Sequence, residues 1–338
     1  MADQLDAIVD RVRSVTAGHP GWAIEGHGSK SFLGYRDPHL EVLSMESHSG
    51  VINYWPEELI IRARAGTSLD ELEATLAASR QRLIFEPPRC NLKGTLGGAI
   101  ASGLAGPRAP FSGHIRQALL GVQILQSDGQ VTRFGGEVVK NVAGYDVSRL
   151  MIGALGIFGP LLDVSLRVLP IPAWEGFFAK GADDSVLHAL RARRHDVGLS
   201  GAGIVNGQVC LRYEGAAANA RDTTAKLKRL GYEVVEGAAF AALRDLTFFT
   251  DVLWRWEGDP ETPLTGHEVA VDWIGRLRYY LAPEMMPPSG QVWAYGQTSP
   301  EADRLPVVEP IKKALLERLK RTFDPDSRFN AGRMFKEF

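Results

Sequence analysis

Cysteine is nearly absent from this 338-residue chain: Cys90 and Cys210 are the only two, and they stand far apart. Such a pair builds no disulfide framework, and it supplies too few ligands for an iron–sulfur cluster. No apolar run approaches the ~20 residues that cross a bilayer. The N-terminal stretch MADQLDAIVDRVRSV carries acids and lacks the apolar core of a signal peptide. These absences predict a cytoplasmic protein, with attachment to the inner face of the membrane through a partner left open.

Neither sign of charge is in excess. Lysine and arginine number 38 and aspartate and glutamate number 40, so the chain offers no basic stripe for nucleic acid. The hydrophobic fraction of 45% is that of an ordinary globular protein. The length predicts about two domains with room for a buried pocket.

Motifs for hydrolysis or metal binding are missing too. None of the eight histidines pairs with another at a metal-ligand spacing in the second half of the chain, and His267-Glu268 lacks the second histidine of HExxH. Gly198–Ala202 lacks the last glycine of a G-x-S-x-G elbow. The sequence therefore predicts no metal and identifies no catalytic base.

Regular periodicity is present in the first half of the chain. It predicts helices at 3–17, from the Ser68/Glu71 capping box to about Arg80, and starting within Gly94–Gly106. It also predicts strands at Trp22–Glu25, Glu41–Ser44, Leu59–Ala65 and Leu161–Leu169, and a hairpin of two strands at Ala118–Gln126 and Gln130–Phe134.

The second half reads as α+β. We expect strands near 200–205 and 208–213, a helix near 216–229, a strand at Tyr232–Val235, and a C-terminal helix marked by Ile311, Leu315, Leu319 and Phe323. Residues 241–308 show only weak periodicity. Pro170 and Pro172 predict a domain boundary.

Three glycine-rich segments are candidates for chemistry. The first, GHGSKSFLG at 26–34, can present consecutive backbone N–H groups to a diphosphate. Its candidate binding residues are Gly26, His27, Gly28, Ser29 and Lys30. The alternative is a surface turn with a solvated lysine.

The second segment, PPRCNLKGTLGGAIASG at 87–103, leads from a proline-rigid loop to a glycine pair at a helix start. Its candidates are Pro88, Thr95, Leu96, Gly97, Gly98, Ser102 and Gly103. The alternative is close helix–sheet packing, which also favours small residues.

The third segment runs from Gly135 to Pro170 and carries KNVAGYDVSRLM followed by glycines at 153, 156 and 159. Its candidates are Lys140, Asn141, Gly144, Tyr145 and Ile157. The alternative is a set of tight turns.

In this order, the three segments resemble the FAD-binding domain of flavoproteins of the vanillyl-alcohol oxidase (PCMH) type. The tail FDPDSRFNAGRM is similar to that family's D-P-x-x-x-x-N-P-G-[KR] ending, with Asn330 retained and Ala331 in place of proline. Residues 103–121 and 134–151 are most similar to one branch of the family, the FAD-binding subunits of bacterial glycolate oxidases.

The resemblance implies an α+β fold. It consists of a two-part PCMH-type FAD-binding domain at 1–170, a smaller α+β cap at 171–308, and a C-terminal helix and tail at 309–338 that return to the flavin. It also implies an FAD-binding subunit in a complex that oxidises glycolate or a similar 2-hydroxy acid to the 2-oxo acid. The implied partners are a larger FAD-containing subunit that handles the small substrate and an iron–sulfur subunit that takes electrons onward.

Covalent attachment of the flavin needs a histidine or cysteine at positions that the family fixes. Here Ser29 and Lys93 occupy those positions, and His27 and Cys90 are out of register. The resemblance therefore implies non-covalent FAD. Lys140 or Arg116 could place positive charge near the reduced flavin, with a surface salt bridge as the alternative for each.

Two other functions stay open. A free-standing FAD-dependent 2-hydroxy-acid dehydrogenase would need a clamp for the substrate carboxylate, for which Arg255, Arg276 and Arg278 are the candidates and solvated arginines the alternative. A structural subunit with the same fold would bind no flavin.

Overall fold

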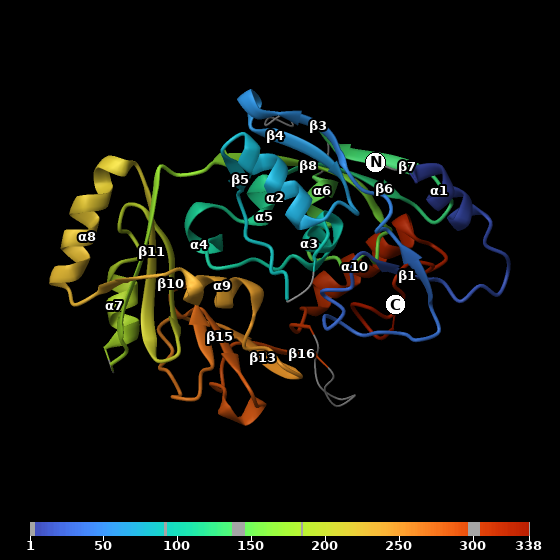
Figure 1. Ribbon diagram of the computed structural model, residues 1–338. Helices are drawn as coiled ribbons and strands as arrows, with labels where there is room; N and C mark the ends of the chain where they lie inside the picture. The colour runs from blue at the N-terminus through green and yellow to red at the C-terminus, as the bar shows by residue number, and fades with distance from the viewer. Residues whose placement is uncertain (1–3, 91–92, 137–145, 184, 297–304, 338) are drawn as a thin grey trace.

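The chain folds into two large antiparallel sheets and one short parallel pair of strands. The computed structural model describes residues 4–90, 93–136, 146–183, 185–296 and 305–337. Figure 1 shows the larger of the two antiparallel sheets at lower left and the other at upper right. This is the mixed α+β architecture that the sequence predicts.

The parallel pair is formed by β1 (Trp22–Glu25) and β2 (Glu41–Ser44), covered by helix α1 (Leu5–Arg13). Their shared core contains Ile8, Val9, Val12, Trp22 and Leu43. The helix is shorter than the predicted 3–17. Its last turn is closed by the N–H of Ser14 on the carbonyl of Asp10, and the chain then turns away at Gly18, which has a left-handed φ of 92°.

The first sheet has the strand order β3-β4-β8-β6-β7, and β5 pairs with the far end of β8. Its strands are β3 (Val51–Trp55), β4 (Ile60–Arg64), β5 (Gln81–Leu83), β6 (Leu119–Leu125), β7 (Val131–Gly135) and β8 (Leu161–Pro170). The associated helices are α2 (Leu69–Ala78), α3 (Leu96–Ser102), α4 (Ala109–Ser112), α5 (Ile115–Ala118) and α6 (Val147–Leu150), with a 3-10 turn at Pro56–Glu58. The predicted Ser68 cap of α2 is confirmed, because its hydroxyl accepts the N–H of Glu71 at 3.1 Å.

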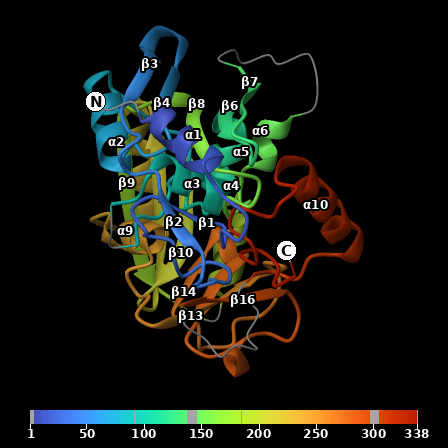
Figure 2. The ribbon, with the colours of Figure 1, turned by 90° about the vertical axis from the view of Figure 1, so that its right-hand side faces the viewer.

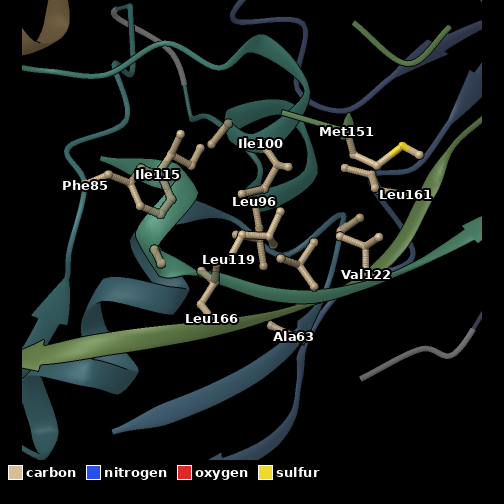
Figure 3. Packing of buried hydrophobic residues seen from close by; sticks show 14 of the residues in the cluster. Ala63, Phe85, Leu96, Ile100, Ile115, Leu119, Val122, Met151, Leu161 and Leu166 are labelled. Carbon is tan, nitrogen blue, oxygen red and sulfur yellow. The ribbon is translucent and has the colours of Figure 1, made fainter. Parts of the chain in front are cut away.

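Helix α3 packs closely against this sheet. Figure 3 shows Leu96 and Ile100 from α3 among Ala63, Leu119 and Val122 of the strands. Gly97 makes the approach possible, because a Cβ on it would lie 2.8 Å from the Cβ of Ala65. The predicted helix–sheet packing is therefore real.

The second sheet has the order β12-β9-β11-β10-β14-β15-β13-β16 and is antiparallel throughout. Its strands are β9 (Trp174–Gly181), β10 (Leu199–Val205), β11 (Gln208–Gly215), β12 (Glu233–Val235), β13 (Val252–Glu257), β14 (Ala270–Asp272), β15 (Leu277–Tyr280) and β16 (Gln291–Gly296). Helices α7 (Val186–Ala192), α8 (Ala220–Arg229) and α9 (Ala238–Asp245) accompany it, with 3-10 turns at Ala217–Asn219, Trp273–Gly275 and Pro283–Met285.

An ion-pair network joins the two sheets. Glu214 of β11 accepts two hydrogen bonds from Arg82 of β5, at 2.6 and 3.0 Å, and one from Arg108 at 2.7 Å. Arg212 of β11 in turn binds Glu86 at 2.7 Å. Four of these five side chains are at most 12% exposed, so the network lies inside the junction.

The last helix, α10 (Pro310–Phe323), crosses back from the second sheet to the first. Figure 2 shows it beside the molecule, between the level of α6 above and β16 below. The ring of Phe323 packs 5.8 Å from those of Phe134 and Phe158. Only the end of the predicted apolar stripe is covered, because Ile311 and Leu315 face solvent with 85% and 53% of their surface exposed.

Candidate cofactor site

The loop after β1 presents a row of unpaired backbone donors. The N–H groups of four consecutive residues, His27 to Lys30, reach no acceptor among the described residues. Gly28 has a left-handed φ of 70°, and the loop is closed by the N–H of Ser31 on the carbonyl of Gly28 at 3.0 Å. Consecutive amides in such a turn form a concave site for an anion.

Lys30 is buried, so the alternative of a solvated surface lysine is wrong. Only 9% of it is exposed, and its Nζ donates to the hydroxyl of Ser29 at 2.9 Å. Burial lowers the pKa of Lys30, while Cys90 and Asp245 act in the opposite direction. An anion bound at the loop would favour the charged form of this lysine.

The start of α3 lies directly against this loop. Thr95 caps the helix by accepting the N–H of Gly98 at 3.1 Å. A Cβ on Gly26 would lie 2.4 Å from the Thr95 hydroxyl, so this glycine is required by the contact. On Gly98, by contrast, a Cβ would meet only that hydroxyl within 4 Å. Open space therefore adjoins the backbone of α3.

The C-terminal tail and the loop after β1 together line the open space beside the start of α3. Asn330 accepts the N–H of Ile24 at 2.8 Å and donates to the carbonyl of Leu155 at 2.6 Å. Gly156, with φ 75°, leaves room for it, because a Cβ there would lie 2.6 Å from the Asn330 amide nitrogen. One side chain thus ties β1, the turn before β8 and the tail together.

These segments line a trough that opens into a large cavity. The trough consists of two pockets of about 100 and 70 Å³, both lined by Gly26, Thr95, Gly98, Leu155 and Asn330. The large cavity, of about 650 Å³, continues from it, since Ser102 and Leu155 line both. A groove of this form suits an elongated ligand with a bulky end.

The large cavity lies between the two sheets and α10. Ser102 to Leu104 and the segment from Ile152 to Leu155 form one wall, Arg255 and Trp293 of the second sheet form another, and Lys312 and Leu316 of α10 form a third. Arg116, Arg149 and Asp146 also line the cavity, and Arg149 pairs with Asp146 at 3.0 Å. Cationic side chains therefore outnumber anionic ones around this cavity.

Most of the residues predicted to bind a cofactor come together here. Those that line the trough or the large cavity are Gly26, His27, Gly28, Ser29, Lys30, Thr95, Gly97, Gly98, Ser102, Gly103 and Asn330. Arg116 also lines the large cavity.

Three predicted residues do not line these cavities. Pro88 is buried elsewhere, and Leu96 and Ile157 pack in the core of the first sheet with 1% and 0% exposed, because each is an apolar residue on the sheet side of its segment. Lys140, Asn141, Gly144 and Tyr145 lie outside the described residues.

Leu155 is a lining residue that the sequence did not single out. It borders all three pockets and has a left-handed φ of 51°. The signal was the glycine on either side of it, at positions 153 and 156, which marks a tight turn without indicating that the intervening leucine meets a ligand.

The arginine candidates have different environments. Arg276 is exposed, as the solvated alternative expects, but Arg255 and Arg278 are buried, at 6% and 0% exposure. Arg278 donates to the carbonyls of Thr262, Pro263 and Gly275, so its role is structural. Of the three candidates, only Arg255 lines the large cavity.

The two residues considered for covalent attachment differ in their surroundings. Burial raises the pKa of the Cys90 thiol to about 11, so it is protonated at neutral pH and a poor nucleophile. His27 contacts the carbonyl of Lys93 through Nδ1. Among the described residues, no cluster of histidine, cysteine, aspartate or glutamate is placed to hold a metal ion. No helix in the described ranges has the length and apolar content needed to cross a membrane.

Comparison with known proteins gives a full-length match. The family described as "FAD binding domain" matches residues 2–135. The chain is 34% identical to the glycolate oxidase subunit GlcE of Escherichia coli, over 99% of this chain and 98% of that protein.

Shorter matches link the chain to other oxidoreductases. It is 30% identical to the glycolate oxidase subunit GlcD of Bacillus subtilis and 32% identical to a D-lactate dehydrogenase of Archaeoglobus fulgidus, each over about a third of this chain and less than a quarter of the relative. The solved structure of alkyldihydroxyacetonephosphate synthase superposes on 98% of the chain with a TM-score of 0.67 at 13% identity, which shows a shared fold.

Proposed function

The chain belongs to the family of the glycolate oxidase subunit GlcE, a family of FAD-linked oxidoreductases, and from this membership we propose that it is the FAD-binding subunit of a glycolate-oxidising complex. The observation that carries the proposal is the row of unpaired amides at His27–Lys30 at the head of a trough that opens into a 650 Å³ cavity.

These residues fit FAD. The amides of the first loop would hold the diphosphate, with the Ser29 hydroxyl and the Lys30 ammonium adding a donor and a charge. Thr95, Gly98 and Asn330 would line the path of the ribityl chain, and the large cavity would take the ring system. Bound FAD would supply a two-electron acceptor.

The protein groups around the cavity would tune that acceptor and shield it. Arg116 and Lys312 bring positive charge to the lining, and positive charge favours a reduced, anionic ring system. The second sheet covers the cavity with Arg255 and Trp293, which limits water access.

We propose non-covalent binding. The Cys90 thiol is protonated, and Ser29 and Lys93 occupy the family's attachment positions. Acid precipitation of the holoprotein should therefore leave all flavin in the supernatant.

The proposed partners are a larger FAD-containing subunit that oxidises glycolate or a similar 2-hydroxy acid, and an iron–sulfur subunit. Two cysteines cannot hold a cluster, so the iron–sulfur centre of the proposed complex would lie on another chain. We also propose a cytoplasmic location and a division into an FAD-binding domain at 1–170, a cap at 171–308 and a returning helix and tail at 309–338.

The second candidate function, a free-standing 2-hydroxy-acid dehydrogenase, is favoured by one observation, the buried Arg255 on the large cavity. Anaerobic addition of glycolate to the FAD-loaded chain distinguishes the electron-transfer subunit from the free-standing dehydrogenase. An unbleached flavin spectrum supports the electron-transfer subunit, and bleaching without partners supports the dehydrogenase.

Gly98→Val tests the cofactor site directly. The added side chain projects from α3 into the trough, so we expect FAD affinity to fall at least about tenfold. Gly181→Val is the matched control, because a Cβ there meets nothing within 4 Å and lies away from the trough. FAD titration followed by absorbance measures both. Equal affinity in the two variants, or no FAD uptake by the unmodified chain, would contradict the proposal.

A further inference from the structure

Arg255 is a buried cation whose surroundings leave it incompletely paired. Its side chain is 7% exposed, and its guanidinium lies between two indole rings, with Cζ 5.3 Å from the centroid of Trp273 and 4.8 Å from that of Trp293. Such stacking fixes the plane of the group.

The guanidinium makes few hydrogen bonds within the chain. One nitrogen donates to the Tyr295 hydroxyl at 3.0 Å and another to Glu257 at 3.2 Å, while Nε finds no acceptor in the described part of the structure. Glu257 also pairs with Arg276, so it neutralises only part of their combined charge. A buried donor without a partner is unfavourable, so the chain itself leaves this guanidinium incompletely satisfied.

The backbone beside Arg255 is held in an uncommon conformation. Trp273 and Ile274 are consecutive non-glycine residues with left-handed φ values of 51° and 60°. The conformation is secured from both sides, since the indole of Trp273 donates to the carbonyl of Gly106 at 3.1 Å and its N–H donates to Asp272 at 2.8 Å. Strain of this kind collects at binding and active sites, and here it positions a ring against Arg255.

The charges around the large cavity select for an anion. Among the residues that the structure describes, Arg116, Arg149, Arg255 and Lys312 line it, against Asp146 alone. We propose that this subunit itself binds a small carboxylate, the 2-hydroxy acid or its 2-oxo product, in the large cavity, and that Arg255 binds the carboxylate group. The inference rests on the proposed function, because the reactant of the complex is such an acid. A planar guanidinium pairs with both oxygens of a carboxylate, and the stacked rings hold it ready to do so.

Calorimetric titration of the full-length chain with oxalate, with and without FAD, tests the proposal. We expect the unmodified chain to bind oxalate and Arg255→Met to weaken binding by roughly tenfold to a hundredfold. Arg255→Lys, which keeps the charge but lacks the planar fork, should also weaken binding, and it replaces the methionine variant if that one fails to fold. Arg276→Met is the matched control, an exposed arginine paired with the same Glu257, and should change affinity by less than about twofold.

Three results would overturn the inference: no heat with oxalate in the FAD-loaded chain, equal oxalate affinity in folded Arg255→Lys and Arg276→Met, or loss of FAD affinity instead of oxalate affinity in the Arg255 variants. FAD affinity is measured separately by absorbance. Failure to bind FAD would therefore count against the proposed function, while the oxalate titration of the same chain would still decide the role of Arg255.

Discussion

Asp272 is a carboxyl group that the fold keeps protonated through much of the acidic range. It is 2% exposed, and burial raises its pKa to about 7. A folded-state pKa above the unfolded value means that this residue costs stability as the pH rises from about 4 to about 7, because the unfolded chain releases the proton first.

Replacing the carboxyl by an amide should remove that cost. Asp272→Asn keeps an oxygen for the N–H of Trp273, so we expect it to match the unmodified chain near pH 4 and to exceed it by a few kcal/mol at pH 8. Urea unfolding at both pH values measures the difference. If the difference in free energy of unfolding between the variant and the unmodified chain does not grow with pH, Asp272 is ionised in the folded protein.

Single residues were the hardest feature to predict from the sequence. Arg255, Arg276 and Arg278 stand within one short stretch, yet one lines a cavity, one is solvated and one binds three carbonyls. Local pattern does not distinguish them, because burial depends on which strands lie alongside. The glycine-rich loops were predictable, because a backbone that must approach a ligand closely requires glycine, and glycine is visible in the sequence.

At the scale of elements, Lys320 holds α10 to the rest of the cofactor wall. Its Nζ donates to Asp324 and to the carbonyls of Ile157 and Phe329, and it is 1% exposed. The lysine thereby joins the helix, the turn before β8 and the tail residue that precedes Asn330.

Lys320→Met should therefore cost both stability and cofactor. It leaves the buried Asp324 carboxylate without its cation, a loss of ~3–5 kcal/mol, and it frees the tail that positions Asn330, so FAD affinity should fall as well. Arg321→Met, which removes an exposed cation from the last turns of the same helix, is the control. Thermal melts measure the loss of stability and FAD titration measures the loss of affinity. An unchanged Tm and an unchanged FAD affinity in the Lys320 variant would contradict the role assigned to this lysine.

Elements followed the sequence where a turn, a cap or a run of apolar residues marks them, and the prediction was poorest in the stretch 241–308. The strands β6 and β7 and the capped helix α2 lie where alternation and capping predict them. The stretch 241–308 showed weak periodicity because β14 and β15 are buried on both faces, so hydrophobic and polar residues do not alternate. For α10, the helical spacing of apolar residues predicted the helix correctly, but it did not predict that Ile311 and Leu315 face solvent.

At the scale of the whole molecule, the ion-pair network around Glu214 holds the two sheets together at their junction. Burial raises the pKa of Glu214, but Arg82 and Arg108 outweigh it and bring the value to about 2. A depressed pKa stabilises the fold above about pH 4.5, and that stabilisation is lost as the pH falls toward 2.

Glu214→Gln should destabilise the protein at neutral pH by ~3 kcal/mol or more, because Arg82 and Arg108 would remain buried without a full partner. Below about pH 4.5, the free energy of unfolding of the variant should also fall less steeply with decreasing pH than that of the unmodified chain. Unfolding followed by denaturant at pH 7 and pH 4 checks both. A variant as stable as the unmodified chain at pH 7 would mean that apolar contacts alone hold the junction. The sequence could not foresee this network, because its members lie up to 132 residues apart.

The link between Ile24 and Asn330 spans 306 positions of the chain. During translation β1 leaves the ribosome long before the residue that braces it has been added, so the wall of the trough is incomplete until residue 330 has been made. Capture of the flavin must therefore wait until residue 330 has left the ribosome. A ribosome stalled short of residue 330 would display a folded first sheet that is still unable to hold its cofactor.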